Sequence, residues 1–206
     1  MKLHVSSALT TEQHTDLTSL VPLYPAALLA KMAATIDVHF DGRFNRLSGV
    51  TLEPPPTQQP HPPIWIAGRS KAAMKRAARY GDGWLPYFYT PEMLARSLTR
   101  IADHQEEIGR EQKMNAGVDL FFTVHEDRNT ALAMSAERLG AVYGQDFSKV
   151  VSKYAVAGTP AECCARLREY IDAGARSILV DSVCSDEYEE ENWHWLTTEV
   201  LPAFRD

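Results

Sequence analysis

The stretch Pro62–Tyr87 decides the fold, and it reads PPIWIAGRSKAAMKRAARYGDGWLPY. Ile64–Ala67 is a short apolar run after two prolines, which predicts a buried parallel strand. The next residues predict a helix over Lys71–Tyr80 and a second strand over Trp84–Tyr87. Strand, helix and strand in this order form a βαβ unit, so we expect parallel strands joined by a right-handed crossover.

The turn between the first strand and the helix holds the candidate chemistry. Ser70 is a suitable N-cap for the helix, and Gly81 is a suitable residue to end it. A helix that begins directly after a parallel strand points free N–H groups toward the carboxyl end of the sheet. This placement predicts a phosphate site at Gly68, Arg69 and Ser70. The alternative is that Gly68 only turns the chain and Ser70 only caps the helix.

This stretch resembles the fifth and sixth strands of the bacterial luciferase-like family of flavin-dependent oxidoreductases. The resemblance rests on Pro62–Gly68, Ser70 and Ala77–Trp84, and on Gly158–Val180, which is similar to the lead into the family's eighth strand. It covers about two thirds of the chain. It implies that the turn at 68–70 holds the phosphate of the cofactor.

The N-terminal part resembles the family's third strand at Leu17–Leu23 and the helix that follows it. In the family a non-proline cis peptide bond often lies on this strand, beneath the flavin ring. The resemblance therefore implies that Ser19 and Leu20 contact the cofactor, and the alternative is an ordinary trans strand. After Asp37 the family's fourth strand is missing. The first two strand–helix units are absent or replaced by Met1–Asp16.

Alternating strands and helices predict an α/β fold. The resemblance implies a partial or shortened TIM-type (β/α) barrel, with parallel strands and outer helices, in a single luciferase-like domain over residues 1–206. A closed barrel typically takes about 250 residues, so we do not expect one chain of 206 residues to close it. Because an incomplete barrel exposes strand edges, we expect a homodimer or another chain that supplies the missing strands. The alternative is a truncated product that folds poorly.

The rest of the chain continues the alternation. A cap at Thr90 predicts a helix, and a capping box beginning at Thr159 predicts another. Further elements are expected at these positions: a doubtful strand at Leu3–Val5, strands over Val118–His125 and Ser177–Val180, a helix over Asn129–Tyr143, a short helix within Phe147–Val156, and a closing helix marked by Trp193, Leu196 and Val200. The apolar stripe of the helix after Thr90 comprises Leu94, Leu98, Ile101 and Ile108.

Composition excludes several classes of protein. The net charge of −6, from 27 acidic and 21 basic side chains, opposes general nucleic-acid binding. The chain has no long uncharged apolar run and opens without a signal peptide, so we expect no membrane span and a cytoplasmic location. Cys163, Cys164 and Cys184 lack the spacing of a zinc site or a disulfide framework. Cys163 and Cys164 are adjacent in a predicted helix, and we expect them to be packing residues or inert thiols.

The resemblance implies an oxidoreductase, specifically a monooxygenase, that uses reduced FMN or a deazaflavin coenzyme (F420) with a small-molecule substrate. No side chain is a secure general base, and the catalytic residues are therefore unassigned. The candidates near strand ends are Tyr87, His125 and Asp181. The alternative function is a non-catalytic flavin-binding or assembly protein, because the missing units would have formed walls of the substrate and flavin site.

Overall fold

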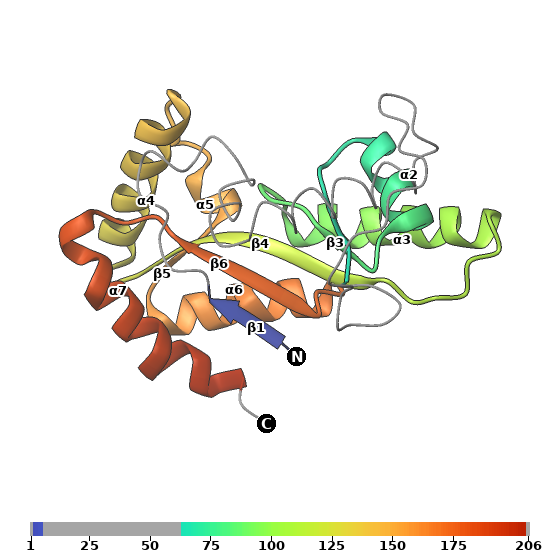
Figure 1. Ribbon diagram of the computed structural model, residues 1–206. Coiled ribbons are helices and arrows are strands. Elements are labelled where there is room, and N and C mark those ends of the chain that lie inside the picture. Colours follow the sequence, from blue (N-terminus) through green and yellow to red (C-terminus); the bar gives the residue numbers. More distant parts are fainter. Residues whose placement is uncertain (1, 6–62, 205–206) are drawn as a thin grey trace, which may run out of the picture. The chain divides into compact units, whose positions relative to one another are not determined.

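The computed structural model describes residues 2–5 and 63–204 (Figure 1). The predicted strand at Leu17–Leu23, with Ser19 and Leu20, lies outside the described residues. The doubtful strand at the N-terminus is confirmed, because Lys2–Val5 form strand β1. This strand pairs with the last strand of the chain, Lys2 opposite Ser177 and Val5 opposite Val180.

The described residues form one sheet in which every strand pair is parallel. The strands are β1 (Lys2–Val5), β2 (Trp65–Ala67), β3 (Gly83–Leu85), β4 (Asn115–Val124), β5 (Ala155–Gly158) and β6 (Ser177–Ser182). Their order across the sheet is β1-β6-β4-β3-β2, and β5 pairs with the end of β4. Figure 1 shows β4 and β6 side by side along the middle of the sheet.

Helices follow most of the strands, as the α/β pattern predicts. They are α2 (Lys71–Tyr80), α3 (Pro91–Glu107), α4 (Arg128–Tyr143), α5 (Val151–Tyr154), α6 (Pro160–Asp172) and α7 (Glu189–Trp195), with a π-helical turn over Leu196–Val200 and a 3-10 turn over Leu201–Phe204. Three predicted caps are confirmed. Ser70 accepts a bond from the N–H of Ala73, Thr90 accepts one from Met93, and Thr159 makes both bonds of a capping box.

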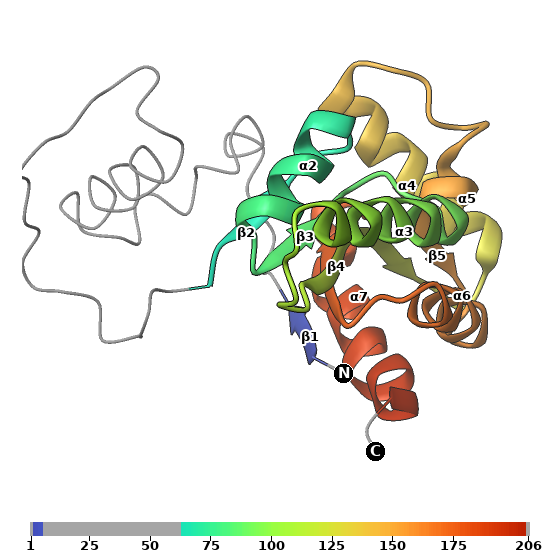
Figure 2. The same cartoon turned by 90° about the vertical axis from the view of Figure 1, so that its right-hand side faces the viewer.

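Alternation along β4 divides its side chains between the two faces of the sheet. Every second residue packs under helices α2, α3 and α6 and the C-terminal helical segment: Val118, Leu120, Phe122 and Val124. Ile178 and Val180 of β6 join the same core, and Figure 2 shows α3 and α6 lying along the sheet. The predicted arrangement of parallel strands with flanking helices is therefore confirmed.

Gly81 ends α2 as predicted, but not through the left-handed conformation that glycine often adopts after a helix. Its backbone is extended rather than left-handed, with φ −84° and ψ 141°. A Cβ atom there would lie only 3.0 Å from the carbonyl oxygen of Gly83 and 3.0 Å from Cγ1 of Ile66. Close packing of the helix end on the βαβ unit thus requires glycine here.

Two details of the predicted pattern are wrong. Ile108 is 52% exposed, because α3 has ended at Glu107 and the apolar stripe no longer faces the sheet. The short helix predicted within Phe147–Val156 is confirmed as α5, but the prediction omits strand β5, which begins in the same region and in which Val156 pairs with Phe122. A strand of four residues is too short to show a clear alternation of side chains in the sequence. The position of β5 is set by its pairing with β4.

The C-terminal helical segment is locked to the sheet by the buried side chain of Asn192. Its Oδ1 accepts the N–H of Val124 at 2.7 Å. Its amide nitrogen donates to the Phe122 carbonyl at 3.3 Å and to Ser182 Oγ at 2.8 Å. These bonds satisfy buried backbone groups at the carboxyl end of β4. Such groups need a partner within the protein, because the helix covers them and water cannot reach them.

Cys163 and Cys164 are packing residues, as predicted, and all three cysteines are free and buried. Cys163 Sγ lies 3.6 Å from the carbonyl oxygen of Gly158, whereas Cys164 Sγ lies 3.9 Å from that of Val200. Burial raises the pKa of Cys163 to about 12, so it stays a thiol at neutral pH. No helix among residues 63–204 is long and apolar enough to span a bilayer.

Candidate functional site

The site begins at the turn between β2 and α2. Gly68 has φ +108°, a conformation that side chains rarely adopt, and a Cβ atom there would approach the Cβ of Ala73 at 3.1 Å. The carbonyl oxygen of Gly68 accepts a hydrogen bond of 2.9 Å from Nε1 of Trp84 on the neighbouring strand. The turn is therefore shaped by glycine and held in place by the core of the sheet.

The N-terminus of α2 follows directly. The first N–H groups of an α-helix have no acceptor within the helix. Ser70 Oγ accepts the N–H of Ala73 at 3.1 Å, and the earlier N–H groups of the first turn point the same way. Ser70 and Arg69 are exposed beside them. Such an array binds anions, since it combines backbone donors, a hydroxyl group and a guanidinium group.

Arg69 is oriented by an aromatic ring from the next strand. Its guanidinium carbon lies 5.3 Å from the centre of the Tyr87 ring. Tyr87 continues β3 and pairs in parallel with Asp119 of β4, and the N–H of Asp119 donates to the Pro86 carbonyl at 2.9 Å. The turn is thus connected through Tyr87 to the face of the sheet opposite the helix-covered core.

On that face Asp119 meets a second carboxyl group. Desolvation, together with the charge and hydrogen bonding of Asp181, raises the pKa of Asp119 to about 8. The Oδ1 atom of Asp119 is shielded from solvent and has no hydrogen-bond partner within the described part of the chain. At neutral pH this pair holds one proton, because two close carboxyl groups in a poorly solvated place do not both ionise.

The structure brings together two of the three candidate bases. Tyr87 and Asp181 lie on either side of Asp119 across the strands. His125 lies just beyond β4 and packs instead against the ring of Tyr188, with 5.3 Å between ring centres. Its Nδ1 accepts the N–H of Asp127 at 2.9 Å, which gives it a role in the turn before α4.

Asp119 was missed by sequence reasoning. It lies inside the apolar run of β4, between Val118 and Leu120. The available signal was a single acidic residue on the alternate face of a predicted buried strand, which requires a polar or ionisable neighbour. That neighbour, Asp181, lies 62 positions later in the sequence, and only the strand register places the two together.

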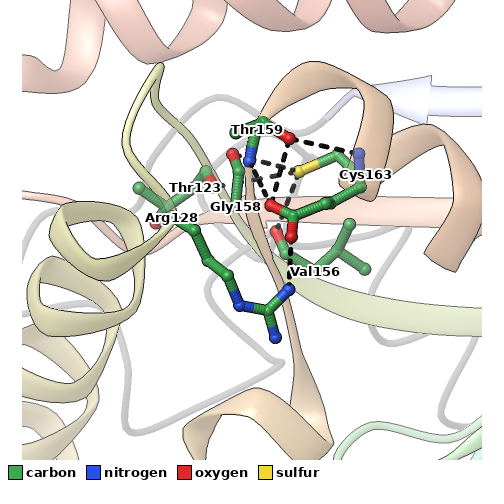
Figure 3. A network of polar contacts seen from close by, with 7 residues as sticks. Thr123, Arg128, Val156, Gly158, Thr159 and Cys163 are labelled. Atoms are coloured by element: carbon green, nitrogen blue, oxygen red, sulfur yellow. Dashed lines mark hydrogen bonds and ion pairs between the residues drawn. The ribbon is translucent and has the colours of Figure 1, made fainter.

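A second polar network joins the N-terminal ends of α4 and α6 (Figure 3). Arg128 donates to Glu162 at 2.7 Å, and Glu162 accepts the N–H of Thr159 at 3.0 Å. The Thr159 backbone bond and the Arg128 guanidinium hold the pKa of Glu162 below its usual value. Gly158 has φ +151°, and a Cβ atom there would meet the Glu162 carboxylate at 2.7 Å. Every charged group of the network is paired, so it braces the carboxyl ends of β4 and β5 and is not a reaction site.

The family model for the luciferase-like monooxygenases matches residues 26–177. The chain belongs to this family.

Solved structures of luciferase-like enzymes share the fold. The chain is 18% identical to an F420-dependent secondary alcohol dehydrogenase, with TM-score 0.65, covering 80% of this chain and 55% of that one. It is 22% identical to the monooxygenase RslO1 from Streptomyces bottropensis, with TM-score 0.64 and the same two coverages. It is also similar to the coenzyme F420 dependent tetrahydromethanopterin reductase from Methanopyrus kandleri, with TM-score 0.53 and 15% identity, covering 69% of this chain and 51% of that one. This luciferase-like chain spans about half the length of these proteins.

The residues at the β2–α2 turn fit the phosphate of a flavin-type coenzyme. Gly68 allows close approach, and the start of α2 supplies backbone donors. Arg69 would place one positive charge beside a bound phosphate group. Ser19 and Leu20, expected beneath the ring, lie outside the described residues. Among the residues described here, no group of histidine, cysteine or acidic side chains has the arrangement of a metal site.

Proposed function

We propose that this luciferase-like chain is an oxidoreductase, specifically a monooxygenase, that uses reduced FMN or the deazaflavin coenzyme F420 on a small-molecule substrate. The observation that supports this best is the turn formed by Gly68, Arg69 and Ser70 at the carboxyl end of β2, where the exposed start of α2 meets an oriented guanidinium group. When bound, the coenzyme supplies the electron-transfer chemistry, and the protein positions it and excludes water.

The proposed roles of the residues follow from their contacts. Backbone N–H groups at the start of α2, with Arg69, bind the phosphate, and the Trp84 side chain fixes the turn through the Gly68 carbonyl. The ring of Tyr87 holds the guanidinium group of Arg69 through a contact of 5.3 Å between the guanidinium carbon and the ring centre. We also assign Ser19 and Leu20 to contact with the ring, as the family resemblance implies.

A binding experiment tests this proposal without a known substrate. The full chain is titrated with FMN and with F420, and binding is followed by cofactor fluorescence. Gly68→Val should abolish binding. Arg69→Ala should weaken it by about 10- to 100-fold, as expected for the loss of a charged hydrogen bond of roughly 1.5–3 kcal/mol. Circular dichroism establishes that each variant is folded.

Gly109→Val is the matched control. Gly109 also has a positive φ, +66°, and a Cβ atom there would meet nothing within 4 Å. Gly109→Val therefore also places a side chain at a positive φ, but after α3 and outside the turn, and should leave cofactor affinity unchanged. Unchanged affinity in a folded Gly68→Val protein would refute the phosphate site. Tight binding without turnover of any substrate would favour the alternative, a flavin-binding or assembly protein.

We further propose that residues 1–206 form a single luciferase-like domain that works as a cytoplasmic homodimer. Within the described part of the chain, β1 and β2 are the outer strands of the sheet, and partner strands stabilise open edges. Free, buried cysteines are typical of a reducing compartment. Light scattering after size-exclusion chromatography measures the mass, and a compact monomer would refute the dimer.

A further inference from the structure

A row of polar side chains crosses the face of the sheet opposite α2, α3 and α6, beside the second apolar cluster in which Phe121 packs against α4 and α5. It runs from Arg69 at the end of β2 to Tyr87 after β3, Asp119 on β4 and Asp181 on β6. Four neighbouring strands thus contribute one polar group each. The row begins at the turn assigned to the cofactor phosphate, and it ends at the pair of carboxyl groups.

The pair lies in surroundings that keep one proton on it near neutral pH. Asp119 is mostly shielded from solvent and faces Asp181. Three other titratable or charged groups face this region, namely Tyr87 beside β3, Tyr143 on α4 and Arg69. Burial is the main reason that the pKa of Tyr143 is raised to about 12, so this hydroxyl stays neutral where the carboxyl pair titrates.

A purely structural role does not explain two acidic residues here. Burying carboxyl groups costs free energy unless all of their oxygen atoms are paired, and Oδ1 of Asp119 has no partner in the described part of the chain. An apolar residue at this position would avoid that cost. A carboxyl group that titrates near the working pH, in contrast, is suited to exchange protons with a bound molecule.

The strand register shows which of the two carboxyl groups lies nearer to the end of the sheet at which a ligand would bind. Asp119 lies opposite Leu179, and Asp181 lies opposite Phe121, two residues closer to the carboxyl ends of the strands. Ligands of parallel sheets bind outside those ends. Asp181 is therefore the group that faces the ligand, and Asp119 lies behind it.

We propose that Asp181 exchanges a proton with the substrate and that Asp119 is the positioning residue that shares this proton with it. This inference rests on the proposed oxidoreductase function. The substrate class is a small molecule with a hydroxyl, carbonyl or amine group at the reacting carbon. In one direction an O–H or N–H bond of the substrate breaks and an O–H bond forms on the carboxylate. In the other direction the carboxyl proton moves to the substrate oxygen or nitrogen.

The first test observes the proton directly and needs no cofactor. The full chain is labelled with carbon-13 at the aspartate carboxyl groups and titrated by NMR. One carboxyl signal should titrate near pH 8, and Asp119→Asn should remove this step. Asp103→Asn, at an exposed position on α3, is the matched control and should leave it unchanged. Absence of any such titration overturns the proposal.

The second test measures the role in turnover. Full-length protein is given FMN or F420 with a panel of alcohols, aldehydes and amines, and kcat and KM are measured between pH 6 and 9. Asp181→Asn should lower kcat by about 100-fold or more, as expected for loss of a general acid or base. In Asp119→Asn the change of rate around pH 8 should vanish, while cofactor affinity stays that of the wild type.

The outcomes separate this inference from the function on which it rests. If neither cofactor binds, or none of the panel is turned over, the oxidoreductase function fails and the proton-exchange role falls with it, even where the NMR titration is seen. If turnover occurs and Asp119→Asn keeps the wild-type pH profile, the function stands and the role of the pair is refuted.

Discussion

The buried carboxyl group of Asp119 predicts an unusual dependence of stability on pH. Its pKa is raised from an ordinary value of 3.8 to about 8 in the folded protein. Between these two values the folded state holds a proton that the unfolded state has lost. The stabilisation from this group is thus fully present below about pH 4 and is lost as pH rises toward 8.

The magnitude follows from proton linkage. One proton of difference changes the free energy of unfolding by about 1.4 kcal/mol for each pH unit. From pH 5 to pH 7 the wild-type protein should therefore lose roughly 2–3 kcal/mol through Asp119. Asp119→Asn places a neutral amide at the same position, so the variant should lose this slope and gain stability relative to the wild type as pH rises.

Several other groups with shifted pKa values titrate outside this window. The carboxyl groups with lowered pKa values, such as those of Asp127 and Glu162, titrate below it. Burial raises the pKa of Cys163 to about 12 and that of Cys184 to about 11, and these thiols titrate above it. The difference between the slopes of the wild type and of Asp119→Asn therefore measures the contribution of Asp119 between pH 5 and pH 8.

Urea unfolding of the full chain at pH 5, 6, 7 and 8, followed by tryptophan fluorescence and circular dichroism, measures the free energy at each pH. Asp103→Asn is the matched control and should keep the wild-type slope. A wild-type stability that does not fall across this range would refute the burial argument. The same conclusion would follow if Asp119→Asn retained the wild-type slope.

Three further substitutions test the supports of the sheet and the turn. Asn192→Ala leaves the buried N–H of Val124 unpaired, while the Phe122 carbonyl keeps its bond from the N–H of Val183, and should cost about 1–3 kcal/mol in urea unfolding; a loss well under 1 kcal/mol would contradict this role of Asn192. Gly158→Ala adds a Cβ atom against Glu162 in a strained conformation and should lower stability by about 1–3 kcal/mol, and an unchanged thermal midpoint would count against it. Trp84→Phe removes the bond to the Gly68 carbonyl and should weaken FMN binding by roughly fivefold, about 1 kcal/mol, whereas unchanged FMN fluorescence titrations would show that the turn needs no such support.

Local signals in the sequence were sufficient for the helix starts. Ser70, Thr90 and Thr159 each cap the helix that they were expected to cap, because an N-cap bond involves only residues a few positions apart. Strand β5 was missed, because its four residues carry no period and its place is fixed by pairing with Phe121–Val124. Ile108 was wrongly assigned to the core, because the exact end of a helix depends on its tertiary surroundings.

The candidate site was predictable only in part for the same reason. The turn at Gly68, Arg69 and Ser70, which we propose as the phosphate site, is continuous in sequence, and its residues and the start of its helix lie where the pattern indicated. The proton-sharing pair is not continuous. Asp181 was a candidate because it follows a predicted strand, but Asp119 had no visible partner until β4 and β6 were placed in register.

One property of β4 connects the core of the fold with this site. Because side chains alternate along a strand, the register that buries Val118 and Leu120 under the helices also turns Asp119 to the opposite face. A slip of one residue would exchange the two sets, placing a carboxyl group in the apolar core and leaving two aliphatic side chains on the face of the polar row. Burial of the aliphatic residues therefore stabilises the register that brings Asp119 to Asp181. The free energy that holds the sheet together also maintains a carboxyl pair that is costly by itself.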